Sequence, residues 1–264
     1  PSEVNSITFL FDAPHNVPVF CIVGDPEQMN HVLTTNRRTN KPEYESSVKY
    51  FEADGTLGVS FNCGLRPKGR SSMDNPQNSL SFRLRSAYGQ KDIIYPFFDE
   101  SPIALYSTLS LRNAGQDSRA SRIHDPFFQS VAKGLNLDTI ETKTVVAYVN
   151  GKYCGVYDLN EEQRSGYFLA HYGLDDNEID VIERDSTLIY GDNEEFLYIR
   201  KIAREWDMAD DAVFAQFTEL VDVDACTDYL IMQIYFGNGD VLNQRFWRAQ
   251  DYSVKWRPLL FGLD

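Results

Sequence analysis

The sequence predicts an α+β fold, with a β-rich N-terminal lobe over residues 1–160 and a mostly helical C-terminal lobe over residues 161–264. Short β-favouring runs, separated by clusters of Asp, Asn, Pro and Gly, recur through the first part. After about residue 160 the apolar residues recur at helical spacing instead. With 264 residues, the chain is long enough to bury a full core as one large domain or as two lobes.

The strands are predicted from runs rich in β-branched and aromatic residues. The simplest of these runs are residues 6–11, 17–23 and 57–62. In residues 79–85 apolar and polar residues alternate strictly, which predicts a half-buried strand with Arg83 and Arg85 on its polar face. Residues 145–157 predict a hairpin, because Asn150 and Gly151 supply the two positive-φ positions of a type I′ turn.

Three helices are predicted from capping residues and periodicity. Asp125 followed by Pro126 indicates one helix start, and further helices are expected to begin near Asp210 and near Asp222 or Asp224. The expected core faces are Phe128, Val131, Ala132 and Leu135 in the first helix, Phe214, Phe217 and Leu220 in the second, and Cys226, Tyr229, Leu230 and Ile234 in the third. The charged run at residues 175–185 is expected to be a solvated loop or face.

The composition narrows the range of partners. The formal charge of −14 disfavours nucleic acid and anionic membrane surfaces. No apolar run approaches the roughly 18 residues of a membrane span, so none is expected. The four cysteines are far apart and are expected to be free thiols, which leaves the compartment open. Because Pro1 is not a natural start, we expect a processed or trimmed chain.

Three polar residues near the C-terminal end form a candidate phosphoryl-transfer set. Asp240 and Asn243 follow an apolar helix, and Asp264 ends an apolar run. Phosphoryl transfer commonly uses one Asp near the acceptor hydroxyl, an Asn a few residues later and a second Asp on Mg²⁺. Taken alone, an Asp near an Asn in a loop is more often a turn or a cap. Trp247 and Trp256 are expected to be core aromatics.

Other chemistries find less support in the residues. The sequence has no G-x-x-x-x-G-K-[ST] loop, G-x-S-x-G elbow, H-E-x-x-H or paired cysteines, and its four histidines are scattered. A glycosidase would need two facing carboxylates. Glu161 and Glu162 follow the hairpin closely enough to be considered for that pair, although their spacing does not single them out.

Several segments in order along the chain resemble the spore coat protein H (CotH) kinase family. They are residues 18–26, 69–72, 76–80, 88–89, 95–98, 111–113, Asp117, 149–157, Glu161, 191–192, 238–247 and 256–264. The resemblance implies an atypical protein-kinase-like, two-lobed fold. It also implies that the chain binds ATP with Mg²⁺ or Mn²⁺ and phosphorylates Ser or Thr of a protein substrate. Its setting would be a spore coat, a cell surface or the secreted fraction.

The same resemblance assigns roles to individual residues. Asp240 looks like the catalytic Asp, Asn243 like its polar partner near the metal, and Asp264 like the metal-binding Asp. Glu161 resembles an acidic family position that orients metal or a basic partner. On physical grounds Arg83 and Arg85 are candidate phosphate contacts, because arginine offers a bidentate fork, although a solvated strand face would look the same.

Two departures from the family pattern keep a non-catalytic, scaffold-like member open as the alternative. Asn78 stands where relatives tend to have Lys, with Lys68 or Arg83 as possible substitutes. Gly262 stands where relatives often have the first Asp of an Asp-x-Asp pair. The chain also ends at Asp264, where a kinase-like helical lobe would normally continue, so we expect either a truncated chain or an incomplete lobe. A carbohydrate-binding or carbohydrate-active β domain is a further alternative, resting only on the aromatic content of 13%.

Overall fold

The computed structural model describes residues 15–184 and 186–263. This part of the chain is a strand-rich mixed structure with six α-helices, consistent with the predicted α+β class. It divides into two compact units, one with residues 15–126 and 141–170 and the other with residues 127–140, 171–184 and 186–263. The division therefore differs from the expected boundary at 160/161, because residues far apart in sequence join the same unit. The strand predicted at residues 6–11 lies outside the described residues.

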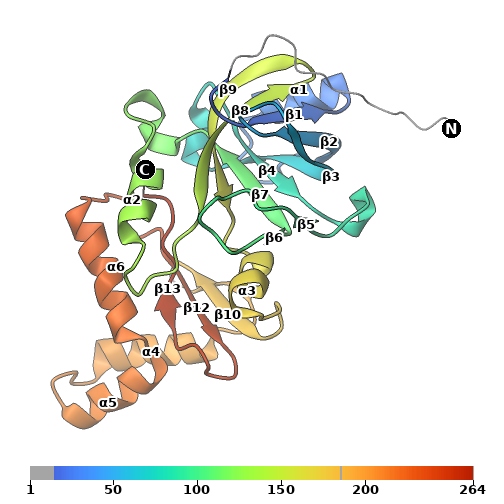
Figure 1. Ribbon diagram of the computed structural model, residues 1–264. Helices are drawn as coiled ribbons and strands as arrows, with labels where there is room; N and C mark the ends of the chain where they lie inside the picture. Colours follow the sequence, from blue (N-terminus) through green and yellow to red (C-terminus); the bar gives the residue numbers. More distant parts are fainter. Residues whose placement is uncertain (1–14, 185, 264) are drawn as a thin grey trace. The chain divides into compact units, whose positions relative to one another are not determined.

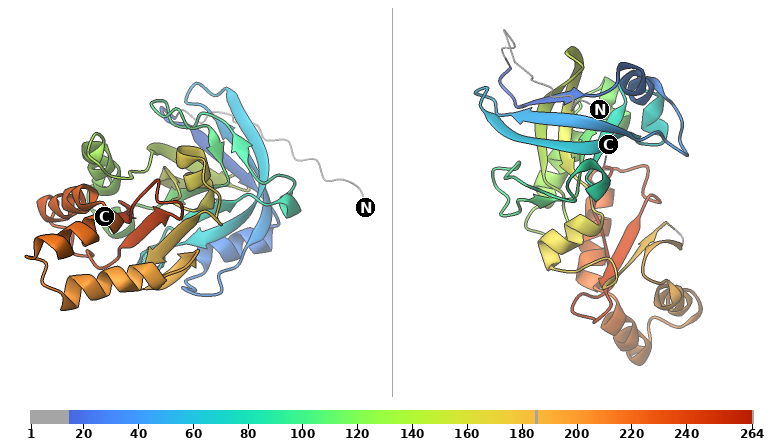
Figure 2. Two further views of the ribbon diagram at one scale, coloured as in Figure 1. Left: turned by 90° about the horizontal axis from the view of Figure 1, so that it is seen from below. Right: turned by 90° about the vertical axis from the view of Figure 1, so that its right-hand side faces the viewer.

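The first unit is built on a closed barrel with the strand order β1-β2-β3-β4-β7-β9-β8 (Figures 1 and 2). Its strands are β1 (Val19–Val23), β2 (Tyr44–Phe51), β3 (Leu57–Lys68), β4 (Ser79–Arg83), β7 (Thr108–Arg112), β8 (Thr142–Val149) and β9 (Lys152–Glu161). Parallel pairing of β1 with β8 closes the barrel, and every other neighbouring pair in it is antiparallel. Two short strands, β5 (Ile93–Ile94) and β6 (Leu105–Tyr106), pair separately. Closure leaves no unpaired strand edge in the barrel.

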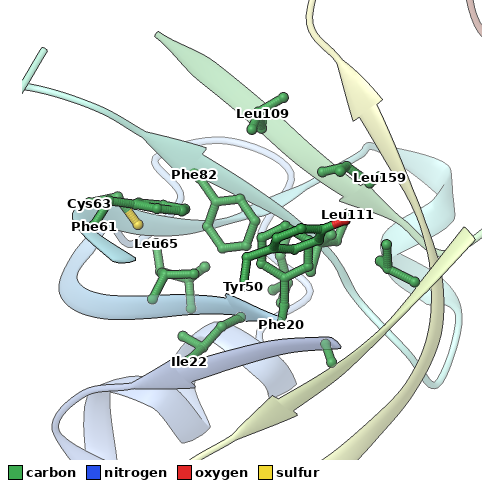
Figure 3. Packing of buried hydrophobic residues seen from close by; sticks show 14 of the residues in the cluster. Phe20, Ile22, Tyr50, Phe61, Cys63, Leu65, Phe82, Leu109, Leu111 and Leu159 are labelled. Carbon is green, nitrogen blue, oxygen red and sulfur yellow. The ribbon is translucent and has the colours of Figure 1, made fainter. Parts of the chain in front are cut away.

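Apolar side chains from every strand fill the barrel, as Figure 3 shows for a cluster around Phe20, Tyr50 and Phe82. The Phe20 and Phe82 rings stack with centroids 5.3 Å apart. Helix α1 (Pro26–Thr34) adds Met29 and Val32 to the same core. The predicted hairpin is confirmed as β8 and β9, with φ of 48° at Asn150 and 77° at Gly151.

The second unit has a four-stranded sheet with the order β11-β10-β12-β13. The strands are β10 (Ile179–Glu183), β11 (Thr187–Tyr190), β12 (Arg245–Ala249) and β13 (Arg257–Pro258), and the helices are α4 (Glu194–Glu205), α5 (Asp211–Leu220) and α6 (Val223–Tyr235). Helix α2 (His124–Ala132) and helix α3 (Ser165–Tyr172) each cross a boundary between the units. This unit is accordingly less purely helical than the sequence suggests. As predicted, Trp247 and Trp256 are buried.

The expectation of a solvated loop or face holds for residues 175–178, which are exposed, but it is wrong for Ile179–Glu183, which form the buried strand β10. Asp180 is only 1% exposed. Its carboxylate accepts a hydrogen bond from Arg248 Nε at 2.7 Å and another from the Asp192 backbone N at 2.9 Å. A carboxylate that is paired in this way can be buried inside a sheet.

Two of the three predicted helix starts are confirmed, whereas several residues predicted to lie in the core are exposed. Asp210 and Asp222 are N-caps whose carboxylates accept backbone N–H groups. Asp125 instead lies in the first turn of α2, buried and 3.8 Å from the Arg112 guanidinium. Five residues expected in the core are exposed, because helical spacing marks an apolar face without specifying which part of it a neighbour covers. They are Val131, Leu135, Phe214, Leu230 and Ile234.

Two expectations from composition can be compared with the described residues. No helix among them is long and apolar enough to cross a membrane. All four cysteines are free thiols, as predicted.

Candidate functional site

A polar face runs across strands β3, β4 and β7 on the side of the barrel wall opposite the apolar core. Successive strand residues point to opposite faces, so Leu65, Leu80 and Leu109 enter the core while their neighbours do not. The register pairs Arg66 with Ser81 and Ser81 with Ser110. Lys68, Arg83 and Arg112 continue the same alternation. The local sequence therefore places four cations on one face of three adjacent strands.

Glu162, which directly follows β9, is the carboxylate at the centre of this face. Ser81 Oγ donates a hydrogen bond to Glu162 Oε1 at 2.7 Å, and Lys68 Nζ lies 3.4 Å from the same oxygen. Arg164 Nε donates to Oε2 at 3.1 Å, and Arg83 Nη2 lies 3.8 Å from it. Only 4% of the Glu162 side chain is exposed. One buried carboxylate thus holds three cationic side chains together.

The charge of this cluster is unbalanced toward the positive. Burial would raise the pKa of Glu162, but Lys68, Arg83 and Arg164 outweigh it and hold that pKa well below its usual range. Burial lowers the pKa of Lys68 to about 8 although Glu162 opposes the change. The pKa of Lys41 is also lowered to about 8, mainly by burial and to a smaller extent by nearby arginines. Such a crowded set of cations around a single carboxylate favours binding of a polyanion.

Two of the predicted cofactor-binding residues meet in this cluster, and two do not. Lys68 and Arg83 both contact Glu162. Arg85 lies past the end of β4 and pairs with Glu43 at 3.3 Å, and its side chain is 56% exposed. The Oε2 atom of Glu161 accepts the Glu141 backbone N–H at 3.0 Å. The structure therefore gives Arg85 and Glu161 local partners outside the cluster.

Glu162 was the neighbouring carboxylate that sequence reasoning considered only for glycoside hydrolysis. The alternation of core-facing and outward-facing residues along β9 is the sequence signal that indicates Glu162. Tyr157 and Leu159 face the core, which places Asp158 and Asn160 on the other face, in phase with Glu162. Glu161 is in phase with the core-facing residues, and it pairs in register with the buried Leu109. Counting strand parity back from the hairpin would have singled out Glu162.

Asn78, which stands in place of a lysine in related sequences, has a structural partner set. Its buried Nδ2 donates to the carbonyl oxygens of Val32, Leu33 and Thr35 at 3.2, 3.0 and 2.8 Å. These carbonyls belong to the last turn and C-cap of α1, where intrahelical partners run out. Asn78 therefore closes the end of a helix instead of facing an anion.

We expect Asn78→Ala to lower the free energy of unfolding by about 1–3 kcal/mol, because the substitution leaves buried carbonyl groups without their donor. Urea unfolding of Asn78→Ala and of the exposed control Asn62→Ala would measure this effect. The control should stay within about 0.5 kcal/mol of the unsubstituted chain. Equal stabilities of the two variants would show that Asn78 does not hold the end of α1.

In the second unit, Asp240 and Asn243 lie in the loop that follows α6. The Asn243 backbone N donates to the Asp240 carbonyl at 2.9 Å. The Asp240 backbone N donates to Asn238 Oδ1 at 2.9 Å, which is the Asx-turn expected as the ordinary reading of this segment. The side chain of Asp240 is exposed. The turn thus fixes the backbone while it leaves the Asp240 carboxylate accessible.

The segment before Asp264 approaches the Asn243 side chain. A Cβ at Gly262 would lie 3.8 Å from Asn243 Nδ2, and Gly262 has φ of 63°. Asp264 itself lies outside the described residues. Within residues 15–184 and 186–263, no group of three or more His, Cys, Asp or Glu side chains is arranged to hold a metal ion. The donors present near this loop, the Asp240 carboxylate and the Asn243 amide oxygen, are of the hard type that Mg²⁺ prefers.

Comparison with known proteins agrees with the sequence motifs. The family described as CotH kinase protein matches residues 65–261, which include the Lys68 cluster and the Asp240 loop. A search of the curated proteins found no significant match. Because the match extends over most of its length, the chain belongs to the CotH kinase protein family.

Proposed function

We propose that this protein is a metal-dependent protein kinase that transfers the γ-phosphate of ATP to Ser or Thr residues of a protein substrate. The observation that carries the proposal is the Lys68–Glu162 ion pair, set among further cations on one face of the barrel. An ion pair of Lys and Glu that holds the lysine for the phosphates is a recurring part of protein kinases. Membership of the CotH kinase family supports the same reaction.

Each residue has a proposed task in the transfer. Lys68 and Arg83 bind ATP phosphate oxygens, and Glu162 holds both cations in place. Asp264 and Asn243 would hold Mg²⁺ or Mn²⁺, which would supply charge neutralisation at the phosphates. Asp240 accepts the proton of the substrate hydroxyl while the hydroxyl oxygen forms a bond to the γ-phosphorus. The bond from that phosphorus to the β–γ bridging oxygen breaks, and ADP leaves.

The alternative is a non-catalytic, scaffold-like member of the family, and two observations favour it. Asn78 is engaged with the end of α1, so it does not take over the part of a phosphate-binding lysine. Gly262 brings no carboxylate next to Asn243. A site that lacks one cation and one carboxylate would clamp ATP and its metal less strongly.

Thermal unfolding with and without ATP, in Mg²⁺ or Mn²⁺, separates the two functions. Ligand at about 100 times its dissociation constant should stabilise the native state by about 2.7 kcal/mol. We expect a metal-dependent rise in Tm, and labelled phosphate from γ-labelled ATP on an added protein substrate. Binding without transfer would support the scaffold. The absence of both effects would contradict the proposed ATP site.

The affinity for ATP should fall as the pH rises from 7.5 to 9. Lys68 has a pKa of about 8 in the free protein, and a bound phosphate favours its charged form, so deprotonation competes with binding. One such lysine predicts a loss of about tenfold at pH 9. Calorimetric titrations across this range would measure it. Lys68→Arg should flatten the dependence, because arginine stays charged, and an unchanged slope in that variant would remove Lys68 from the site.

A further inference from the structure

The loop that carries Asp240 begins with a well-defined helix ending. Gly237 follows α6 with φ of 61°. The Asn238 backbone N donates to the Gln233 carbonyl at 3.0 Å, and the Gly237 N donates to the Ile234 carbonyl at 3.1 Å. These are the two hydrogen bonds of a Schellman motif, which reverses the chain direction at a helix end. The backbone leaving α6 is thereby directed into the Asp240 turn.

A second set of hydrogen bonds connects the helix to Asp240 through side chains. Asn238 Nδ2 donates to the side-chain Oε1 of Gln233 at 2.6 Å. Asn238 Oδ1 accepts the Asp240 backbone N–H at 2.9 Å. The Asn238 side-chain amide therefore links two groups: its nitrogen bonds the Gln233 side chain on α6, and its oxygen bonds the Asp240 backbone.

Gln233 is an unusual residue to find buried at this position. It is 4% exposed, whereas the next two residues of α6, Ile234 and Tyr235, are 78% and 77% exposed. Its Oε1 is used by Asn238, but its Nε2 has no hydrogen-bond partner among the described residues. A half-satisfied buried amide lowers stability relative to an apolar side chain of the same shape. Packing alone does not account for a glutamine here.

We infer that Gln233 is a positioning residue that orders the Asp240 turn by holding the Asn238 side chain. The inference rests on the proposed function of Asp240 where it concerns catalysis, but the ordering of the turn is independent of that function. Gln233 does not touch the reacting atoms. It fixes Asn238, and Asn238 fixes the backbone from which the Asp240 carboxylate projects.

The test compares Gln233→Met with the unsubstituted chain by amide hydrogen exchange and steady-state kinetics. Loss of one hydrogen bond in the relay should speed exchange at the Asp240 amide by about tenfold. The kcat of phosphate transfer should fall by about 10- to 100-fold with the KM for ATP unchanged, because the nucleotide contacts remain and only orientation is lost. The Tm should stay the same or rise, which a purely structural role would not produce.

Two further variants make the result specific. Asn238→Ala should lower kcat at least as much as Gln233→Met, because it also removes the hydrogen bond to the Asp240 backbone N. The double variant should be no worse than Asn238→Ala, because both substitutions act on one relay. Gln129→Met removes another buried glutamine, one whose amide is bonded at both ends, to Leu260 and Ile140. It should lower the Tm and leave exchange at Asp240 unchanged.

The outcomes separate this inference from the proposed function. Unchanged exchange at the Asp240 amide in Gln233→Met would overturn the positioning role. Losses of kcat that multiply in the double variant would overturn it as well, since they would mean that Gln233 and Asn238 act separately. If the unsubstituted chain transfers no phosphate, the proposed function fails. Exchange at Asp240 then decides the role of Gln233 by itself.

Discussion

Asp240→Asn is expected to lower phosphate transfer by about 10²- to 10⁴-fold while ATP still binds. The substitution keeps the size of the side chain and the Asx-turn, which uses the Asp240 backbone N–H and not its carboxylate. It removes the group that accepts the hydroxyl proton, and general-base catalysis contributes an effect of this size. Transfer of labelled phosphate and the ATP-induced shift in Tm would be measured on the same preparation.

Asp264→Ala tests the proposed metal-binding role of Asp264. Loss of this carboxylate should abolish both transfer and the metal-dependent part of the ATP-induced shift in Tm. Asp211→Asn, an exposed aspartate in the first turn of α5, is the control and should retain full activity. Normal transfer by Asp240→Asn would remove Asp240 from the reaction. A normal metal-dependent shift in Asp264→Ala would remove Asp264 from the metal site.

The second large effect is expected from Glu162→Gln. This change leaves Lys68, Arg83 and Arg164 without their shared carboxylate, and breaking a buried ion pair in this way costs about 3–5 kcal/mol. We expect the lower end of that range, because Lys68 and Arg164 keep 31% and 41% of their side-chain surface exposed to water. Denaturant unfolding at neutral pH would measure the loss. The control is Glu161→Gln, one residue away and outside the cluster.

Two additions sharpen this prediction. A bound polyanion can replace the missing carboxylate, so ATP or inorganic phosphate should stabilise Glu162→Gln more than it stabilises the unsubstituted chain. Lys68→Met should lower the free energy of unfolding less than Glu162→Gln does, because Glu162 keeps its contacts with two arginines. It should nevertheless lose most of the ATP-induced shift in Tm. Equal stability of the Glu161 and Glu162 variants would contradict the central position of Glu162. A full ATP response in Lys68→Met would contradict the proposed phosphate contact.

Acid unfolding provides a further readout for Glu162. Its pKa in the folded protein lies below the unfolded value, so the native state binds fewer protons and stability rises with pH in that window. The contribution is fully present above the unfolded pKa, about 4.3, and is lost as the pH falls below it. Glu162→Gln should therefore show a shallower loss of stability in acid than the unsubstituted chain. Parallel curves would contradict the ion-pair account.

Local signals predicted those features that depend on a few neighbouring residues. Asn150 and Gly151 suit the positive φ of their turn, and Asp210 and Asp222 cap their helices, because each requirement is met within four residues of chain. The alternation around Arg83 similarly predicted a strand with one polar face, although the strand is not half-buried as expected, since Ser79 and Ser81 on that face are buried. The ordered series of motifs along most of the chain indicated the family that the match confirms.

Local sequence signals did not predict the contacts between residues that are far apart in the chain. Whether Glu161 or Glu162 meets Lys68, which lies more than 90 positions earlier, depends on how β9 is aligned in the barrel. The exposure of Ile234 depends on which neighbours cover α6, and the burial of Asp180 depends on Arg248, a partner from another strand.

The sequence by itself therefore determined the α+β class, the turn at Asn150 and Gly151, two helix caps and the family. Only the tertiary structure decided which carboxylate lies at the centre of the cation cluster, that Asn78 closes the end of α1, and that Gln233 contacts the Asn238 side chain. The physical reason is the range of the forces involved. Backbone conformation and capping are settled by adjacent residues, whereas charge pairing and burial are settled by whatever the completed fold brings within a few ångströms.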